Sequence, residues 1–339
     1  MTMWRETTKH ERNKKLFEEE IAEFLPARIL DFHVHILNAG VIPGGSTFSC
    51  AGHPIDQYEL KDLEQDLAEL YPGRETAAVC FGFPEVAYDR DSNNAYLAGA
   101  CDHWRFFPFR LFDPMEDTTE RLRKELMEGR FLGIKPYPDY VRKADINAVE
   151  IPEMLPERAM EVVNELGLIV MLHIPRKGRL ADELNQRQLV ELCTKYPNAK
   201  IVMAHVGRAY FLKNAVGHLD KLRELTNLYV DLAMLNHWEV LEYLFLHFLH
   251  NRIVYGTDIP IGLAPGKSVE INDQYTYVTP VPWALSISDD HRKLVFTSFL
   301  YEELRAIKKA VARLGLPRSF VEDIFWNNGM ALLHKAAPK

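Results

Sequence analysis

The feature that most constrains the fold is a regular alternation of short apolar segments with helical ones. Eight apolar segments are expected to be buried strands, over 29–36, 76–83, 105–111, 131–135, 168–173, 200–205, 228–231 and 252–258. The helices expected between them span 61–70, 91–103, 116–128, 155–166, 180–195, 209–224 and 236–248. Strands that alternate with helices predict a parallel sheet, because parallel neighbours need a crossover connection.

Eight such units in a chain of 339 residues predict a closed (β/α)8 TIM barrel rather than an open sheet. A helix over 10–25 is expected before the first strand. A C-terminal helical extension is expected over 289–314, 317–324 and 328–335. No G-x-G-x-x-G motif follows the first strand, which disfavours a dinucleotide-binding sheet. Without a repeat or a linker, residues 1–339 are expected to form one domain.

Two connections stand apart from the regular units. The loop 38–58 follows the first strand and is long for a barrel, so we expect it to close over a site. The segment 259–283 is rich in Pro and Gly, and it is expected to be an irregular connection.

The first strand, 29–36, carries three polar residues at alternating positions, Asp31, His33 and His35. Alternate side chains of a strand share one face, so these three are expected to point the same way. Phe32 and the other apolar residues between them would then lie on the opposite face. An unsatisfied buried polar group costs about 1–3 kcal/mol, whereas neutral His is a strong ligand for zinc and related metals. A metal ion is therefore one arrangement that would make the two imidazoles favourable, and the ends of the later strands bear on it.

Four later strands also end in residues that bind metals or move protons, namely His173, His205, Asp258 and Lys135. Barrel enzymes gather their catalytic groups at the C-terminal ends of the strands, where the two histidines of the first strand also belong. Each residue alone has an ordinary alternative, such as a solvent-facing His or an Asp that caps a helix. Their joint occurrence in eight units favours a metal-dependent site.

The ordered set of these residues resembles the amidohydrolase superfamily. Three segments are most similar to its amidohydrolase-2 branch, which holds TIM-barrel hydrolases and non-oxidative decarboxylases: Gly133-Ile-Lys-Pro-Tyr-Pro138, Ala204-His-Val-Gly207 and Asn327-Asn-Gly-Met-Ala-Leu-Leu333. The resemblance covers about residues 28–335.

The resemblance implies a ligand set for a divalent metal, with His33 and His35 from strand one, His173 from strand five and Asp258 from strand eight. His205 on strand six is implied either as a ligand for a second metal or as a group that contacts the substrate or the reactive water. Zinc is the first expected cofactor, and one ion is favoured over two.

Lys135, Tyr137, Arg208 and Arg176 are the expected substrate-binding residues. In binuclear relatives a lysine at the end of strand four is carboxylated and bridges two metals; the alternative is that Lys135 binds the substrate as a cation. Arg208 stands where many decarboxylases of the branch carry Glu, and Arg176 and Arg179 sit just past strand five. Because Arg binds carboxylates with two parallel hydrogen bonds, these residues predict an anionic substrate. The alternative for the three arginines is solvated loop.

Composition excludes several other classes. The net charge of −8 disfavours nucleic acid or an anionic membrane as the main partner. The four Cys lie far apart without a C-x-x-C motif, as expected for reduced thiols in a cytoplasmic protein. The charged segment 1–15 lacks the apolar core of a signal peptide, and the apolar stretch 240–249 is too short for a membrane span.

Three functional hypotheses follow. The first is a metal-dependent hydrolase of a small carboxylate-bearing lactone, amide or ester, in which the metal activates water. Asp258 would move the proton from water to the leaving group, and His205 would stabilise the oxyanion. The second is a metal-dependent non-oxidative decarboxylase of an aromatic or unsaturated acid. The third is a catalytically idle barrel that binds or scaffolds, against which the complete ligand set argues. The residues leave both a monomer and a homo-oligomer open.

Overall fold

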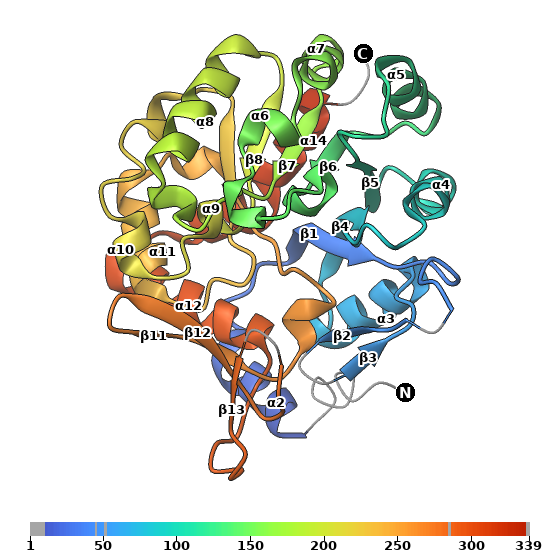
Figure 1. Ribbon diagram of the computed structural model, residues 1–339. Coiled ribbons are helices and arrows are strands. Elements are labelled where there is room, and N and C mark those ends of the chain that lie inside the picture. Colours follow the sequence, from blue (N-terminus) through green and yellow to red (C-terminus); the bar gives the residue numbers. More distant parts are fainter. Residues whose placement is uncertain (1–10, 45, 51–52, 284–285, 337–339) are drawn as a thin grey trace.

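An eight-stranded parallel sheet forms the centre of the computed structural model, which describes residues 11–44, 46–50, 53–283 and 286–336 (Figure 1). Its strands are β1 (Arg28–Ile36), β4 (Glu75–Gly82), β5 (Phe106–Phe112), β6 (Gly133–Pro136), β7 (Ile169–Leu172), β8 (Lys200–Met203), β9 (Leu228–Asp231) and β10 (Ile253–Val254). They are neighbours in the order in which they occur along the chain. The predicted TIM barrel is confirmed.

Hydrogen bonds between β1 and the segment after β10 close the barrel. The backbone N–H of Phe32 donates to the carbonyl of Tyr255 at 2.8 Å, and that of His35 donates to the carbonyl of Ile259 at 2.7 Å. The strand predicted over 252–258 is longer than the observed one, because only Ile253–Val254 pair with β9 in regular register. The residues that follow turn toward β1 instead.

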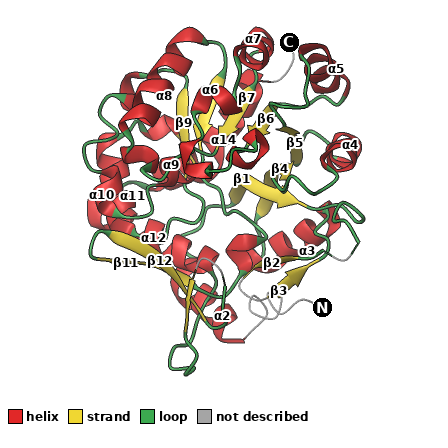
Figure 2. Cartoon of the chain, viewed as in Figure 1, coloured by secondary structure: helices red, strands yellow, loops and turns green. Residues whose placement is uncertain are grey.

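Helices surround the sheet, as Figure 2 shows. Those between barrel strands are α3 (Leu60–Leu70), α4 (Arg90–Ala100), α5 (Thr119–Glu128), α6 (Ile151–Met154), α7 (Glu157–Leu166), α8 (Glu183–Lys195), α9 (His205–Arg208), α10 (Leu212–Ala215) and α11 (Trp238–His247). The flanking helices are α2 (Glu11–Leu16), the π-helix η1 (Phe17–Ile21), α12 (Phe299–Leu314), α13 (Arg318–Glu322), the π-helix η8 (Asp323–Asn327) and α14 (Asn328–Ala336). Among the described residues, every helix falls short of a membrane span in length or hydrophobicity.

Alternate residues of each strand fill the barrel or face the helices. The interior cluster includes Leu30, Val79, Phe81, Phe109, Met171, Val202 and Val254. Trp326 and Leu333 of the C-terminal helices belong to the same cluster, so the extension plugs one end of the barrel. The close approach requires Gly329, because a Cβ there would lie 2.7 Å from Leu30. The other end, where the strands finish, is left for a site.

Two predicted helices differ from the structure. The segment 209–224 contains only α10 and the 3-10 turn η5 (Leu222–Glu224), and Gly217 between them has a φ of +76°, which interrupts a right-handed helix. The helix predicted from residue 289 begins at Phe299, after Ser298, whose hydroxyl accepts a hydrogen bond from the backbone N–H of Tyr301 at 3.2 Å. The predicted helix at 10–25 is helical from Glu11 to Ile21.

The connection predicted as irregular contains a second sheet. Strands β11 (Lys267–Ile271) and β12 (Gln274–Thr279) form an antiparallel hairpin, and β13 (Ser286–Ser288) pairs with β12 in parallel. This sheet packs beside α12 (Figure 1). At their contact the ring of Tyr277 meets Phe299 edge-on at 5.2 Å. A smaller hairpin, β2 (Phe48–Cys50) with β3 (His53–Ile55), occupies the loop 38–58.

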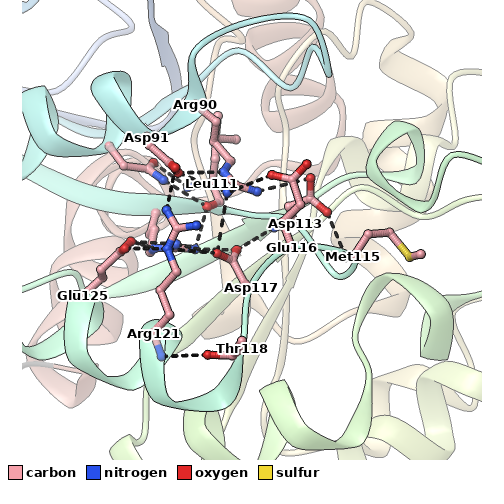
Figure 3. Close-up of polar contacts among 12 residues, drawn as sticks. Arg90, Asp91, Leu111, Asp113, Met115, Glu116, Asp117, Thr118, Arg121 and Glu125 are labelled. Atoms are coloured by element: carbon pink, nitrogen blue, oxygen red, sulfur yellow. Dashed lines mark hydrogen bonds and ion pairs between the residues drawn. The ribbon is translucent and has the colours of Figure 1, made fainter.

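A network of buried charges joins the end of β5 to α4 and α5 (Figure 3). The two terminal nitrogens of Arg110, Nη1 and Nη2, each donate to one oxygen of the Asp117 carboxylate at 2.7 Å. Arg142, in the connection after β6, donates to both oxygens of Asp113 at 3.0 and 2.8 Å. The network therefore anchors the connection that follows β6, which begins with Tyr137.

Candidate metal centre

A bulge in β1 sets the directions of its polar residues. The pairing with β4 shifts register between Asp31 and Val34, so Phe32 lies in the barrel interior, with its ring centroid 6.0 Å from that of Phe109. Asp31 instead accepts a hydrogen bond from the backbone N–H of Thr257 at 3.0 Å. The prediction that Asp31 shares a face with the two histidines is wrong, because a bulge breaks the two-residue alternation of a strand.

The two histidines of β1 meet Asp258 at the C-terminal end of the barrel. The Nε2 atoms of His33 and His35 lie 3.4 and 3.2 Å from the same atom, Oδ1 of Asp258. All three side chains are buried. Their ligand atoms are close enough together to hold one metal ion.

The outward nitrogen of each ring is occupied. The Nδ1 atom of His33 lies 2.8 Å from Oδ2 of Asp231, and Nδ1 of His35 lies 2.9 Å from the carbonyl oxygen of Gly82. Metal-binding histidines usually carry such a partner on the second nitrogen, which orients the ring and sets its tautomer.

These contacts show why a cation fits. A carboxylate oxygen only accepts, so Nδ1 of His33 carries the hydrogen toward Asp231, and Nε2 of the neutral ring turns its lone pair toward Asp258. Two acceptors that face each other are unfavourable unless a proton or a cation lies between them. Burial lowers the pKa of His33 well below its usual value, which disfavours the extra proton. The residues therefore fit a divalent metal.

Asp258 is held as a carboxylate. Burial alone would raise its pKa, but His35, His33 and His205 beside it outweigh burial and lower the pKa below its usual range. Its backbone has a φ of +62°, a conformation that Asp tolerates better than most residues.

Asp231, at the end of β9, is a site residue that sequence reasoning missed. Besides contacting His33, it accepts hydrogen bonds through Oδ1 from the backbone N–H of His205 at 2.7 Å and of Ala233 at 3.2 Å. Asp231, His33 and His205 form a second group whose atoms are close enough for a metal. The available signal was the one used for Asp258, an Asp that ends an apolar strand.

His205 and His173 lie side by side next to this centre. The rings of His33 and His205 have centroids 4.8 Å apart, and His173 meets His205 edge-on at 5.5 Å. Nδ1 of His205 lies 2.9 Å from the carbonyl oxygen of Ala233. Nδ1 of His173 is buried and has no hydrogen-bond partner in the described part of the chain. Tyr137 stacks on His173 at 4.6 Å.

Lys135 is fully buried at the end of β6. Its Nζ atom lies 4.8 Å from the ring centroid of Phe81 and has no hydrogen-bond partner among the residues that the structure describes. Burial lowers the pKa of Lys135 to about 8, against the opposing pull of Asp231 and Asp258. The pKa of this buried amino group is thus close to neutral pH, and the group is available to an anion or to a reaction at this centre.

The two arginines predicted to bind substrate differ in their surroundings. Arg208 ends a run of four consecutive residues with positive φ that begins at His205, and its Nη1 donates to the carbonyl of Ile174 at 3.1 Å. Arg176 is paired, because its Nε lies 3.0 Å from both carboxylate oxygens of Asp182.

The hairpin in the loop 38–58 reaches the centre through aromatic contacts. The ring of Phe83 lies 4.8 Å from that of His35, and Phe48 of β2 lies 4.6 Å from Phe83. The loop therefore packs beside the candidate ligands, as a closing segment would.

The comparisons with known proteins agree with this geometry. A family model described as amidohydrolase, of the amidohydrolase-2 type, matches residues 31–335. The chain belongs to this amidohydrolase family. The prediction from the motifs is thereby confirmed. Among curated proteins, none matches this chain.

Solved structures share the fold of this chain at low identity. An amidohydrolase from Burkholderia multivorans with bound zinc is 14% identical, with a TM-score of 0.55, over 91% of this chain and 99% of its own. A probable 2-pyrone-4,6-dicarboxylic acid hydrolase from Acinetobacter baumannii is 13% identical, with a TM-score of 0.53, over 90% and 99%. The 5-carboxyvanillate decarboxylase from Sphingomonas paucimobilis is 11% identical, with a TM-score of 0.54, over 91% and 99%. The same fold thus carries hydrolases and decarboxylases.

Proposed function

We propose that this amidohydrolase is a metal-dependent hydrolase of a small carboxylate-bearing lactone, amide or ester. The observation that carries the proposal is the meeting of the inward nitrogens of His33 and His35 at one oxygen of Asp258. With the unpartnered His173, these residues would hold one divalent ion. Zinc is proposed because a set of histidines and one carboxylate matches catalytic zinc sites.

Such a metal, when bound, lowers the pKa of water and polarises the carbonyl that is attacked. Asp258 accepts the proton of the attacking water and returns it to the leaving group, because its carboxylate is ionised at the centre. His205 donates its Nδ1 hydrogen to Ala233, so Nε2 of the neutral ring accepts a hydrogen bond and can orient the water. The oxyanion role first expected of His205 would require the protonated ring.

The substrate is proposed to be anionic because positive side chains border the centre. Arg208 is close enough to raise the local potential at Tyr137 and His173, and Lys135 is buried without a counter-ion contact in the described residues. Lys135 would bind a carboxylate at the centre, Arg208 would bind negative charge of the substrate at its rim, and Tyr137 would pack against the attached group. Arg176 stays a weaker candidate because Asp182 already neutralises it.

The alternative is non-oxidative decarboxylation of an aromatic or unsaturated acid at the same centre, with Asp258 as the proton donor. Similarity in fold to a decarboxylase supports it. Arg208 favours hydrolysis, since many decarboxylases of the branch that this sequence resembles carry Glu at the position of Arg208.

One experiment separates the two reactions. The zinc-loaded chain is incubated in ¹⁸O-labelled water with a panel of carboxylate-bearing lactones, amides, esters and aromatic acids, and products are analysed by mass spectrometry. Hydrolysis predicts one labelled oxygen in the product and no carbon dioxide. Carbon dioxide release without label in the organic product would replace the proposal by the decarboxylase, and turnover of no compound would contradict both.

The remaining features of the proposal concern the cellular setting. The four free thiols, which are all buried, suit the reducing conditions of the cytoplasm. The proposed partner is the small anionic substrate rather than a nucleic acid or a membrane.

A further inference from the structure

Arg179 lies in the connection after β7, at the first residue of the 3-10 turn η4 (Arg179–Ala181). Its guanidinium carbon lies 4.4 Å from the ring centroid of Tyr275 and 5.5 Å from that of Tyr210. Its Nε atom is buried and has no hydrogen-bond partner among the described residues. A buried donor of a charged group costs stability, so an unmet Nε indicates that a ligand supplies the acceptor.

A chain of aromatic rings connects Arg179 to the candidate metal centre. The ring of Tyr210 lies 5.7 Å from that of His205, and Tyr275 lies 4.9 Å from Tyr210. Tyr277, the next residue on the same side of β12, lies 5.7 Å from Tyr275. The second sheet thus brings two tyrosines to the mouth of the barrel.

The charges around Tyr277 show how close these elements are. Burial raises the pKa of Tyr277, Asp258 adds to that shift, and the positive charges of Arg179 and Arg208 oppose it. Arg208 also acts on Tyr210, which the Arg179 guanidinium approaches. Both arginines therefore face the same tyrosines within electrostatic range of the catalytic carboxylate.

Within the described ranges, neither arginine forms an ion pair. The structure gives Arg208 one hydrogen bond, to a backbone carbonyl, and gives the Arg179 guanidinium only ring contacts. Arg176, three residues earlier in the same connection, pairs with Asp182. Arg179, Arg208 and Tyr275 are partly exposed, so an anion can reach them.

We propose that Arg179 and Arg208, with Tyr275 and Tyr277, bind a second carboxylate of the substrate, remote from the bond that reacts. The substrate class is then an aromatic or otherwise flat unsaturated acid with two carboxylates, since the rings offer flat surfaces and the guanidinium groups offer paired donors. The assignment of the reacting end rests on the proposed function, whereas the binding of the remote carboxylate does not. Arg179 is a specificity-determining residue in this scheme.

The test uses binding rather than turnover. Isothermal titration of the zinc-loaded full chain with isophthalate and with benzoate compares two carboxylates on a ring with one. We expect isophthalate to bind the wild-type chain about 10-fold more tightly or better, since a hydrogen bond to a charged group contributes roughly that factor or more. Arg179→Met should remove most of this preference, and Arg179→Lys should keep part of it.

Arg187→Met is the control, because it removes an exposed arginine from α8, the helix that follows the same connection. It should leave the preference within about twofold. Equal loss in the Arg187 and Arg179 variants, or an unchanged preference in Arg179→Met with a native circular dichroism spectrum, would overturn the assignment. An Arg179-dependent preference without hydrolysis of any ester or lactone would leave this binding site standing and contradict the proposed hydrolase alone.

Discussion

Nδ1 of His33 lies 2.8 Å from Oδ2 of Asp231, and both side chains are almost completely buried, with 1% and 0% of their surface exposed. Oδ1 of the same carboxylate accepts two backbone N–H groups. Asp231 can accept on both sides only because it is a carboxylate. It thereby holds the hydrogen of His33 on Nδ1 and leaves Nε2 free to bind a metal.

Asp231→Asn should therefore weaken metal binding without removing a ligand. One side of the amide must donate, so it clashes either with the backbone N–H groups or with Nδ1–H of His33, which drives the ring to the wrong tautomer. We expect zinc affinity, measured by competition with a chromogenic chelator, to fall about 10- to 100-fold. Asp220→Asn, at an exposed site, is the control. Equal zinc affinity in the wild type and Asp231→Asn would show that Asp231 does not orient His33.

Arg208→Met should raise KM for an anionic substrate much more than for a neutral analogue of the same shape. The variant removes one charge-assisted contact, worth about 1.5–3 kcal/mol. Steady-state kinetics with both compounds measure the difference. Arg292→Met, at an exposed position, serves as the control. An equal change in KM for the charged and the neutral compound would mean that Arg208 does not recognise the charge of the substrate.

Asp117→Asn should destabilise the fold rather than the chemistry. It removes one of the two carboxylates that contact the buried guanidinium of Arg110, the other being Glu125, so the cost should lie at or below the lower end of the range of about 3–5 kcal/mol for breaking a buried ion pair. Urea unfolding measures the loss, and Glu165→Gln, which breaks the surface pair with Arg123, should change stability little.

The same variant has a defined pH dependence. Burial opposes the Asp117 carboxylate, but the hydrogen bond and charge of Arg110 outweigh it and lower its pKa in the folded state. Its contribution is therefore complete above pH about 4, the ordinary Asp value, and declines as the pH falls toward the lowered pKa. The stability difference between the wild type and Asp117→Asn should shrink over that acidic range. A difference that stays constant there would contradict the ion pair as its source.

The barrel and most candidate ligands could be predicted because both depend on local patterns. Apolar strands followed by helices are visible in the sequence, and strand-end residues such as His173 and Asp258 follow from the barrel topology. The role of Asp231 was missed although it ends a strand in the same way, because its partners His33 and His205 come from other strands.

Other features depend on pairing between distant segments. The bulge that separates Asp31 from the histidines arises where β1 pairs with β4 and with the chain after β10. The sheet of β11 to β13 lies in a segment whose prolines and glycines indicate a loop, and its alternating tyrosines find their partners only across the chain. The alternation of Tyr275 and Tyr277 is itself a strand signal, but a single sequence does not reveal with which segments that strand pairs.

Asp258→Asn tests the proposed acid–base group. The change is nearly isosteric, so the fold should survive and an oxygen remains for the metal. We expect metal content to fall only in part and kcat to fall about 10²- to 10⁴-fold, the usual contribution of general acid–base catalysis. Full metal content together with a near-normal kcat would remove Asp258 from the mechanism.

The most direct test of the metal centre is the metal content of the full chain purified without chelators, measured by inductively coupled plasma mass spectrometry. The account predicts about one divalent ion per wild-type chain, and loss of that ion in His35→Ala and His173→Ala but not in His291→Ala, which alters an exposed residue. Wild-type protein that is active without any divalent metal, or His35→Ala with its metal unchanged, would contradict the central claim.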